Sequence, residues 1–241
     1  MSQFVQTAPQ TAWITGASSG IGLAIVQALL DKGWRVLGID KNKAPVTHEN
    51  YMHVEVDLSD VSAVTTFLQS QTQTSSTQPF AFVHAAGLMH TASLGSLDTA
   101  AGAHMWQVHV QAATLLANAL LPRMQAAKAG RMVLIGSRVS GGMAGRSQYA
   151  ASKAALVSLC RSWAAEVIAD SITVNVISPA ATDTPMLKSG VRSSSAPKLP
   201  PIGRLIDPAE VAELVAYLCS PHASAITGQD IAICGGSSLP K

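Results

Sequence analysis

Short apolar runs alternate with amphipathic stretches along most of the chain. The runs are rich in Val, Ile, Leu and Ala, a composition and length typical of strands that are buried on both faces. Seven runs are predicted to be strands: residues 11–15, 34–40, 53–58, 79–87, 131–137, 172–178 and 230–234. Apolar positions at helical spacing lie between them, and helices are predicted at 23–33, 61–71, 100–127, 148–169 and from 207 onwards.

Strands that alternate with helices predict a parallel sheet, because a parallel neighbour requires a crossover connection. We therefore expect an α/β, doubly wound Rossmann-type fold, with a seven-stranded parallel sheet and helices on both faces. Residues 179–206 contain five prolines and a Ser-Ser-Ser run, so they are predicted to form a loop, of which 185–206 is a short lid. Asp207 and Pro208 then begin a helix as its N-cap and first-turn proline. No repeat or linker divides the chain, and we expect one domain over residues 1–241.

The composition narrows the classes of function. Of 241 residues, 48% are hydrophobic and only 12% are charged, and the formal net charge is +2. This balance is typical of a compact globule, and no cluster of basic residues indicates nucleic acid or an anionic membrane as a partner. Cys160, Cys219 and Cys234 lack the spacing of disulfide frameworks and zinc sites, which favours a reducing compartment and no metal. With no signal-peptide pattern and no long apolar run, we expect a soluble, cytoplasmic protein that acts on a small molecule.

A glycine-rich stretch, TGASSGIG at residues 15–22, follows the first predicted strand and opens the first predicted helix. Glycines at this point let a pyrophosphate approach the helix N-terminus, although a glycine turn can also be purely structural and the spacing differs from G-x-G-x-x-G. Asp40 ends the second predicted strand, where a carboxylate can accept hydrogen bonds from both hydroxyls of an adenosine ribose. An acid there repels a 2′-phosphate, which favours NAD over NADP, and the adjacent Lys41 argues the other way.

Tyr149 and Lys153 lie four residues apart in GRSQYAASKAAL, residues 145–156. Positions i and i+4 share one face of a helix, so the lysine ammonium can approach the tyrosine hydroxyl. A free tyrosine has a pKa near 10, and a positive neighbour lowers it. The spacing alone is equally consistent with an ordinary pair on a helix surface.

Taken in order, these motifs resemble those of the classical short-chain dehydrogenase/reductase family over nearly the whole chain. The resemblance rests on the glycine-rich stretch TGASSGIG, on HAAG at 84–87, on a serine followed by YAASK, on PAATDT at 179–184 and on ITGQDIAICGGSS near the C-terminus. It implies one dinucleotide-binding catalytic domain that transfers a hydride between a nicotinamide cofactor and an alcohol or ketone.

Residue by residue, the resemblance implies the following roles. Tyr149 is the general acid/base, Lys153 holds the nicotinamide ribose and stabilises the phenolate, and Ser137 donates a hydrogen bond to the substrate oxygen. Ser140 competes for the last role, but Ser137 lies at the end of a strand, where α/β sheets bind ligands. The implied cofactor-binding residues are Gly16, Ser18, Ser19, Gly20, Ile21, Asp40, Asp57, Leu58, Ala85, Ala86, Gly87, Lys153, Pro179, Thr182 and Thr184.

Two histidines depart from the family pattern. His109, in VHVQAA, replaces an asparagine that holds a relay water chiefly through its backbone carbonyl. Three interpretations are open. The histidine is tolerated because the backbone carbonyl holds the water, it is a titrating member of the proton relay, or it is a sign of weakened catalysis. His84, in HAAG, replaces an asparagine that bonds within the sheet, and a hydrogen-bonded core histidine is the expected role.

The resemblance does not fix the substrate. Around the site we expect Leu88, His90, Val139, Met143, Met186 and Leu187. These side chains are mostly apolar, which favours a modest secondary alcohol or its ketone, possibly a cyclic alcohol or diol. Arg138 either binds an acidic substrate or, as the preferred interpretation, turns toward a helix or another subunit.

Two other functions remain open: a 3-oxoacyl thioester reductase that uses NADPH, and a catalytically weakened, cofactor-binding regulatory protein. As partners we expect a small-molecule substrate and other copies of this chain. The resemblance implies a homotetramer or homodimer, because the family associates through its two long helices, here 100–127 and 148–169. No nucleic acid and no membrane are expected as partners.

Overall fold

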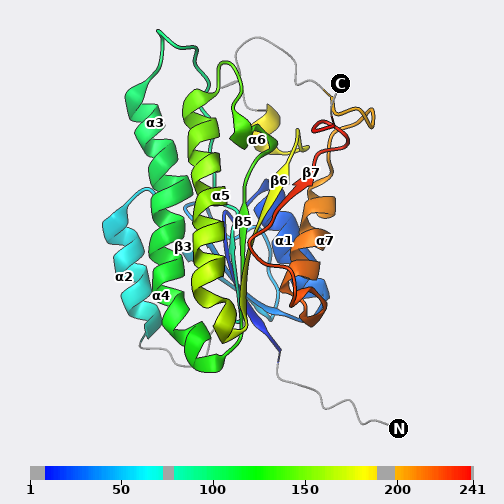
Figure 1. Cartoon of the computed structure of the whole chain (residues 1–241). Helices are drawn as coiled ribbons and strands as arrows, with labels where there is room; N and C mark the ends of the chain where they lie inside the picture. Colours follow the sequence, from blue (N-terminus) through cyan, green and yellow to red (C-terminus); the bar gives the residue numbers. More distant parts are fainter. Residues whose placement is uncertain (1–8, 73–78, 189–198, 240–241) are drawn as a thin grey trace.

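The computed structural model describes residues 9–72, 79–188 and 199–239, and it contains one sheet of seven parallel strands (Figure 1). The strand order is β3-β2-β1-β4-β5-β6-β7. The strands are β1 (Thr11–Thr15), β2 (Arg35–Asp40), β3 (Tyr51–Glu55), β4 (Ala81–His84), β5 (Gly130–Ile135), β6 (Ile172–Pro179) and β7 (Asp230–Ile233). All six pairings are parallel, which confirms the predicted fold class.

Helices cover both faces of the sheet. They are α1 (Gly20–Asp31), α2 (Val61–Thr72), α3 (Thr99–Trp106), α4 (Ala112–Ala127), α5 (Ser147–Val167), α6 (Pro185–Lys188) and α7 (Pro208–Cys219). Figure 1 shows α2, α4 and α5 on one side of the sheet and α1 and α7 on the other. Part of the predicted lid, residues 189–198, lies outside the described residues.

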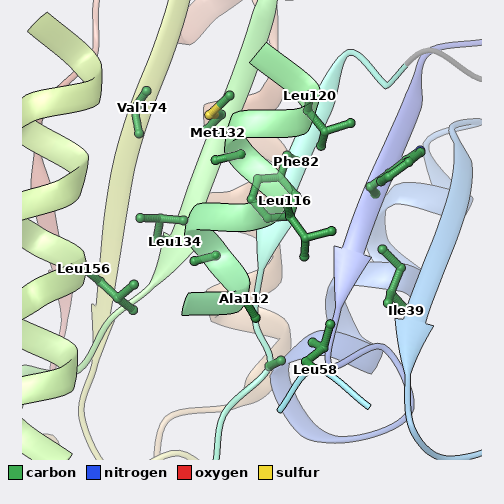
Figure 2. Packing of buried hydrophobic residues seen from close by; sticks show 14 of the residues in the cluster. Ile39, Leu58, Phe82, Ala112, Leu116, Leu120, Met132, Leu134, Leu156 and Val174 are labelled. Carbon is green, nitrogen blue, oxygen red and sulfur yellow. The ribbon is translucent and has the colours of Figure 1, made fainter. Parts of the chain in front are cut away.

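Two apolar clusters hold these layers together. On one face, Leu116 and Leu120 of α4 pack with Phe82 and Leu134 of the central strands, and Leu156 of α5 joins them (Figure 2). On the other face, the buried stripes of α1 and α7 pack over β1, β4 and β5. Because the central strands are buried on both sides, they carry continuous apolar runs, and this is why the sequence pattern predicted them well.

The predicted long helix over 100–127 is interrupted. A π-helical turn at Gln107–Gln111 separates α3 from α4, and the amide of Ala112 donates to the carbonyl of Gln107, five residues earlier. A π turn inserts one residue into the helix and redirects nearby backbone carbonyls, and such turns often lie at functional sites. Here it contains His109, and its geometry depends on the contacts described below.

The third strand also differs from its predicted position, 53–58, because it begins at Tyr51 and ends at Glu55. It is an edge strand, and Met52 is 61% exposed. An edge strand that faces water does not need a continuous apolar run, so the pattern located its start two residues late.

The capping box of α7 provides a test of the fold. Asp207 accepts from the amide of Ala209, and Glu210 accepts from the amide of Asp207, as the sequence predicted for the N-cap. We expect Asp207→Ala to lower the free energy of unfolding by about 1 kcal/mol, because backbone amides at the start of the helix lose their acceptor. Urea denaturation measures this loss. Asp207→Asn keeps a side-chain acceptor and should retain most of the stability; an equal loss in both variants would contradict the capping role.

Candidate active site

A cavity of about 520 Å³ lies at the carboxyl end of the sheet, where the segments that follow all seven strands converge. In a doubly wound sheet this edge binds ligands, because the connections that follow two neighbouring strands run to opposite faces of the sheet and leave a crevice between them. Most of the predicted site residues line it: Gly16, Ser19, Gly20, Ile21, Asp40, Asp57, Leu58, Ala85, Ala86, Gly87, Leu88, Ser137, Val139, Met143, Tyr149, Lys153, Pro179, Thr182, Thr184, Met186 and Leu187.

The glycine-rich loop forms one wall of the cavity. Gly16 has a φ of +70°, and a Cβ on it would lie 2.7 Å from the backbone nitrogen of Ala86. A Cβ on Gly22 would lie 2.0 Å from the carbonyl oxygen of Gly16. Glycine at 16 lets the loop after β1 pack against the segment after β4, and glycine at 22 lets the first turn of α1 pack against this loop. The side chain of Ser19, the N-cap of α1, makes no capping bond, and the first amides of α1 are therefore available to a phosphate.

Asp40 is held in a defined orientation at the end of β2. Its Oδ2 accepts from the amide of Ser18 at 3.1 Å, and its Oδ1 accepts from the amide and side chain of Asn42 at 2.9 and 3.1 Å. Ser18 itself does not line the cavity, so its contribution is to orient this carboxylate. Asn42 and Lys41 do line it, and neither was among the predicted site residues.

Asp57 lies beyond Asp40, after β3. Its Oδ1 accepts from the amide and hydroxyl of Ser59, and these bonds hold the pKa of Asp57 below its usual value. A different residue, Asp60, caps α2 by accepting from the amides of Ser62 and Ala63. The Asp57 carboxylate therefore closes a turn beside the cavity rather than capping the helix.

Ser137, Tyr149 and Lys153 come together at the other end of the cavity. The Lys153 ammonium donates to the carbonyl of Ile135 at 2.8 Å, and burial lowers its pKa to about 7. Ser137 Oγ accepts from the amide of Val139 at 3.4 Å, which leaves its hydroxyl hydrogen for an incoming oxygen. The competing Ser140 does not line the cavity.

His109 lies behind Tyr149, fully buried, and its ring meets the tyrosine ring edge-on at 5.7 Å between centroids. Its Nε2 accepts from the amide of Leu88 at 3.0 Å, so its hydrogen is on Nδ1. That hydrogen points to Ser152 Oγ at 2.8 Å, and Ser152 in turn donates to the carbonyl of Tyr149 at 2.8 Å. His109 is thus a fixed, neutral link between the segment after β4 and the helix that carries Tyr149 and Lys153.

His84 forms a second link with the opposite tautomer. Thr15 Oγ1 accepts from the amides of Ala85 and Ala86, so its hydroxyl hydrogen goes to His84 Nδ1 at 2.9 Å. The hydrogen of His84 is then on Nε2, which donates to the carbonyl of Val108 in the π turn at 3.1 Å. His84 therefore ties β1 and β4 to the interruption between α3 and α4, as expected for a hydrogen-bonded core histidine.

Both histidines are kept neutral. Burial, followed by the positive charge of Lys153, lowers the pKa of His84 to about 3 and holds the pKa of His109 well below its usual range. A neutral imidazole presents one donor and one acceptor, the same pair that an asparagine amide offers along one edge. These bonds favour the interpretation that a histidine is tolerated at 109, and they leave its side chain without a titrating role near neutral pH.

Three predicted residues lie outside the cavity wall: Ser18, His109 and His90. The first two act through Asp40 and through Ser152, as described. The amide of His90 donates to Met105 Sδ at 3.3 Å, and His90 Nδ1 is buried without a hydrogen-bond partner among the described residues. Conversely, Met89, His104, Arg138 and Arg146 line the cavity without having been chosen. For Arg146 a signal was present, because it lies three residues before Tyr149.

In the part of the chain that the structure describes, no group of His, Cys, Asp and Glu side chains is arranged to hold a metal ion. No helix of that part is long and apolar enough to cross a membrane.

Comparison with known proteins identifies the family. A family model described as enoyl-(acyl carrier protein) reductase matches residues 16–238. The chain is 32% identical over 241 residues to cis-4-hydroxycyclohexanecarboxylate dehydrogenase of Sinomonas cyclohexanicum, covering 95% of this chain and 96% of that protein. It is 29% identical over 237 residues to 3-oxoacyl-[acyl-carrier-protein] reductase FabG of Vibrio cholerae, covering 94% and 96%.

A solved structure of 4-hydroxyisoleucine dehydrogenase complexed with NADH is also similar, with a TM-score of 0.86, 27% identity and coverage of 96% of this chain and 100% of that one. The class defined by the fold and these similarities is an oxidoreductase. The chain belongs to the classical short-chain dehydrogenase/reductase family.

The buried histidines make the stability depend on pH. In the unfolded chain His84 takes up a proton near pH 6.5, whereas in the folded protein its pKa is about 3. The unfolded state therefore binds more protons between these values, and stability falls as the pH falls through this window. Below pH 6 we expect His84→Asn to reduce the slope of the free energy of unfolding against pH by about 1.4 kcal/mol per pH unit. Urea denaturation at pH 7.5, 6.0, 5.0 and 4.5 measures it.

The exposed His222 provides the matched control, since His222→Asn removes a histidine without removing a buried one. This control should keep the slope of the unmodified protein. If His84→Asn kept the same slope too, the neutral link between β1, β4 and the π turn would be disproved.

Proposed function

We propose that the protein is an NAD(H)-dependent oxidoreductase that interconverts a small secondary alcohol, such as a cyclic alcohol or diol, and its ketone. One observation carries this proposal: a single cavity joins the glycine-rich loop and Asp40 at one end to Ser137, Tyr149 and Lys153 at the other. A dinucleotide bound along the cavity would bring its nicotinamide to the residues that can move a proton. Both halves of the reaction, hydride and proton transfer, would then take place at one carbon–oxygen bond.

The residues present fit this cofactor. The loop around Gly16 has no room for a Cβ, and the uncapped start of α1 suits a pyrophosphate. The anchored carboxylate of Asp40 suits the two hydroxyls of an adenosine ribose and would repel a 2′-phosphate. When bound, the nicotinamide ring supplies the acceptor or donor of the hydride.

The remaining chemistry belongs to three side chains. Tyr149 would take the proton of the alcohol as its phenolate, or give a proton to the ketone oxygen in the reverse direction. The Lys153 ammonium, with one N–H directed to Ile135, has two further donors for groups that enter the cavity and stabilises the phenolate by its charge. Ser137 would donate to the same substrate oxygen and keep it next to Tyr149.

The wall near these three residues is mostly apolar, with Leu88, Val139, Met143 and Met186. Such a wall suits a compact hydrocarbon skeleton. The names of two similar proteins, cis-4-hydroxycyclohexanecarboxylate dehydrogenase and 4-hydroxyisoleucine dehydrogenase, describe hydroxyl compounds of this size.

A second candidate function is supported by the similarity to 3-oxoacyl-[acyl-carrier-protein] reductase. The form of this function that uses NADPH is disfavoured by the negative charge of Asp40, which would repel a 2′-phosphate. The idea of a catalytically weakened regulatory protein is disfavoured by the complete hydrogen bonding of His109, which holds the helix of Tyr149 in place.

We also propose a cytoplasmic homotetramer. The free thiols Cys160 and Cys219 are buried, as suits a reducing compartment. The low proportion of charged residues and the 49% exposed Trp106 on α3 suit contact with another subunit. Light scattering that gave the mass of one chain would contradict the tetramer.

The relative affinity for NADH and NADPH tests the role proposed for Asp40. We expect the unmodified protein to bind NADH more tightly than NADPH. Asp40→Ala should weaken NADH binding about tenfold or more and bring the two affinities closer together, since a hydrogen-bonded charge is lost. Titration followed by nicotinamide fluorescence measures both constants. Asp31→Asn, at the far end of α1, changes the net charge equally and should alter neither. Preference of the unmodified protein for NADPH would favour the thioester reductase.

Turnover tests the role of Tyr149. Tyr149→Phe keeps the ring against His109 but lacks the hydroxyl, so we expect the rate to fall by about 10²- to 10⁴-fold with NADH binding nearly unchanged. Initial rates over a panel of secondary alcohols with NAD measure the effect. A variant that retained the original rate would exclude Tyr149 as the acid/base.

A further inference from the structure

Two arginines line the end of the cavity that holds Ser137 and Tyr149. Arg138 directly follows Ser137 and begins a 3-10 turn, and Arg146 is the N-cap residue of α5, three positions before Tyr149. Both side chains are partly buried. Among the described residues, neither guanidinium makes a hydrogen bond or an ion pair.

Two other arginines of the chain have partners. Arg204 forms a bidentate pair with Glu210, and Arg131 donates to the carbonyl of Gly130 at 2.8 Å and lies over the ring of Phe80. Two partly buried and unpaired cations on one cavity wall are therefore a local departure, because guanidinium groups are usually matched by carboxylates or carbonyls when water is partly excluded.

The acidic residues of the cavity are too distant to neutralise these arginines. Asp40 ends β2, three strands from β5 in the sheet, and Asp57 follows β3, four strands away. At about 4.8 Å per strand, the nearer carboxylate is about 14 Å from the end of β5, which is beyond the screening length at physiological salt. The hydrogen bonds from Ser18 and Asn42 moreover hold the Asp40 carboxylate at its own end of the cavity.

The backbone positions of the two arginines are fixed. The 3-10 turn of Arg138 is closed by the amide of Ser140 donating to Ser137 at 2.9 Å, and it packs against α5. The amide of Arg146 donates to the carbonyl of Met143 at 3.1 Å, and its own carbonyl accepts from Ala150 at 2.8 Å. The backbone of each arginine is thus held close to Ser137 or Tyr149 by a short turn.

We propose that Arg138 and Arg146 form a subsite for a carboxylate of the substrate, which is therefore a hydroxy acid or the matching keto acid. The inference rests on the proposed function and names its substrate class. Guanidinium groups bind carboxylates through paired N–H bonds, and an apolar strip of Val139 and Met143 adjoins the two arginines on the wall. The carboxylate is unchanged in the reaction: the carbinol C–H passes as hydride to NAD, and the hydroxyl proton passes to Tyr149.

The test compares acids with their neutral esters. The probes are 4-hydroxycyclohexanecarboxylate and 4-hydroxypentanoate, each alongside its methyl ester. The readouts are initial rates with NAD and, independently of turnover, calorimetric binding of each probe to the protein–NADH complex. We expect the acids to bind and to react with a lower KM than the esters.

Charge removal should then act on the acids alone. We expect Arg138→Gln and Arg146→Gln to raise the KM and dissociation constant of the acids about 10- to 100-fold, the usual contribution of hydrogen bonds to a charged group, and to leave the esters unchanged. Arg138→Lys and Arg146→Lys, which keep the charge but not the paired geometry, should retain part of the affinity. Arg35→Gln, exposed at the opposite edge of the sheet, is the matched control for net charge.

The outcomes separate this inference from the proposed function. Esters that bind and react as well as the acids, or acids that fail to bind the protein–NADH complex, overturn the carboxylate subsite. NADH binding and ester turnover would still support the oxidoreductase in the first case. A protein that binds no NADH fails the proposed function itself. A preference for N-acetylcysteamine thioesters over the free acids would overturn the subsite in favour of thioester reduction.

Discussion

Two buried imidazoles of opposite tautomer hold together the end of the cavity where Tyr149 and Lys153 lie. His84 accepts from Thr15 and donates to the π turn, and His109 accepts from Leu88 and donates toward the helix of Tyr149. The two chains of hydrogen bonds connect β1, β4, the π turn and α5. Protonation of either ring would place a donor against a donor, because Leu88 N–H and the Thr15 hydroxyl already point at the acceptor nitrogens. The site therefore depends on both rings staying neutral.

Lys153 contributes to keeping both rings neutral. Its ammonium is buried beside these rings, and its charge contributes to the low pKa of both histidines. Gly87 lies at this junction: a Cβ there would be 3.2 Å from His109 Nε2 and 3.5 Å from Lys153 Nζ. The absence of a side chain at 87 lets a cation, a neutral imidazole and the cavity wall lie close together. Tyr149 and Lys153 consequently lie on a well-packed support at this end of the cavity.

The sequence predicted the fold well where structure follows from local pattern. Apolar runs located the buried strands, and Asp207 with Pro208 marked the start of α7. It also placed Asp40, Ser137, Tyr149 and Lys153 at strand ends and on one helix face, where topology brings them together. The role of each remains a prediction that rests on these positions and on the family.

What the sequence missed depends on contacts between distant segments. The π turn is distinguished from a continuous helix by the bond from Ala112 N–H to the Gln107 carbonyl and by the Val108 carbonyl turned toward His84, and the apolar pattern of residues 100–127 indicates neither. The edge strand β3 contains no fully buried residue, so its start is not marked by an apolar run in the sequence. The sequence alone could not show whether Arg138 lies near a carboxylate. That depends on the strand order, which separates β5 from the carboxylates at the ends of β2 and β3.

That same strand order gives the cavity an electrical polarity. Both of its carboxylates lie at the ends of β2 and β3, where Lys41 also lines the cavity, whereas Arg138, Arg146 and Lys153 all lie beyond β5 with no carboxylate of the cavity beside them. The crevice is therefore more positive at its β5 end, although the net charge of the chain is close to zero. An anionic molecule that enters from solution is attracted more strongly to that end, so the field acts on its direction of approach before any contact forms, and more strongly at low ionic strength.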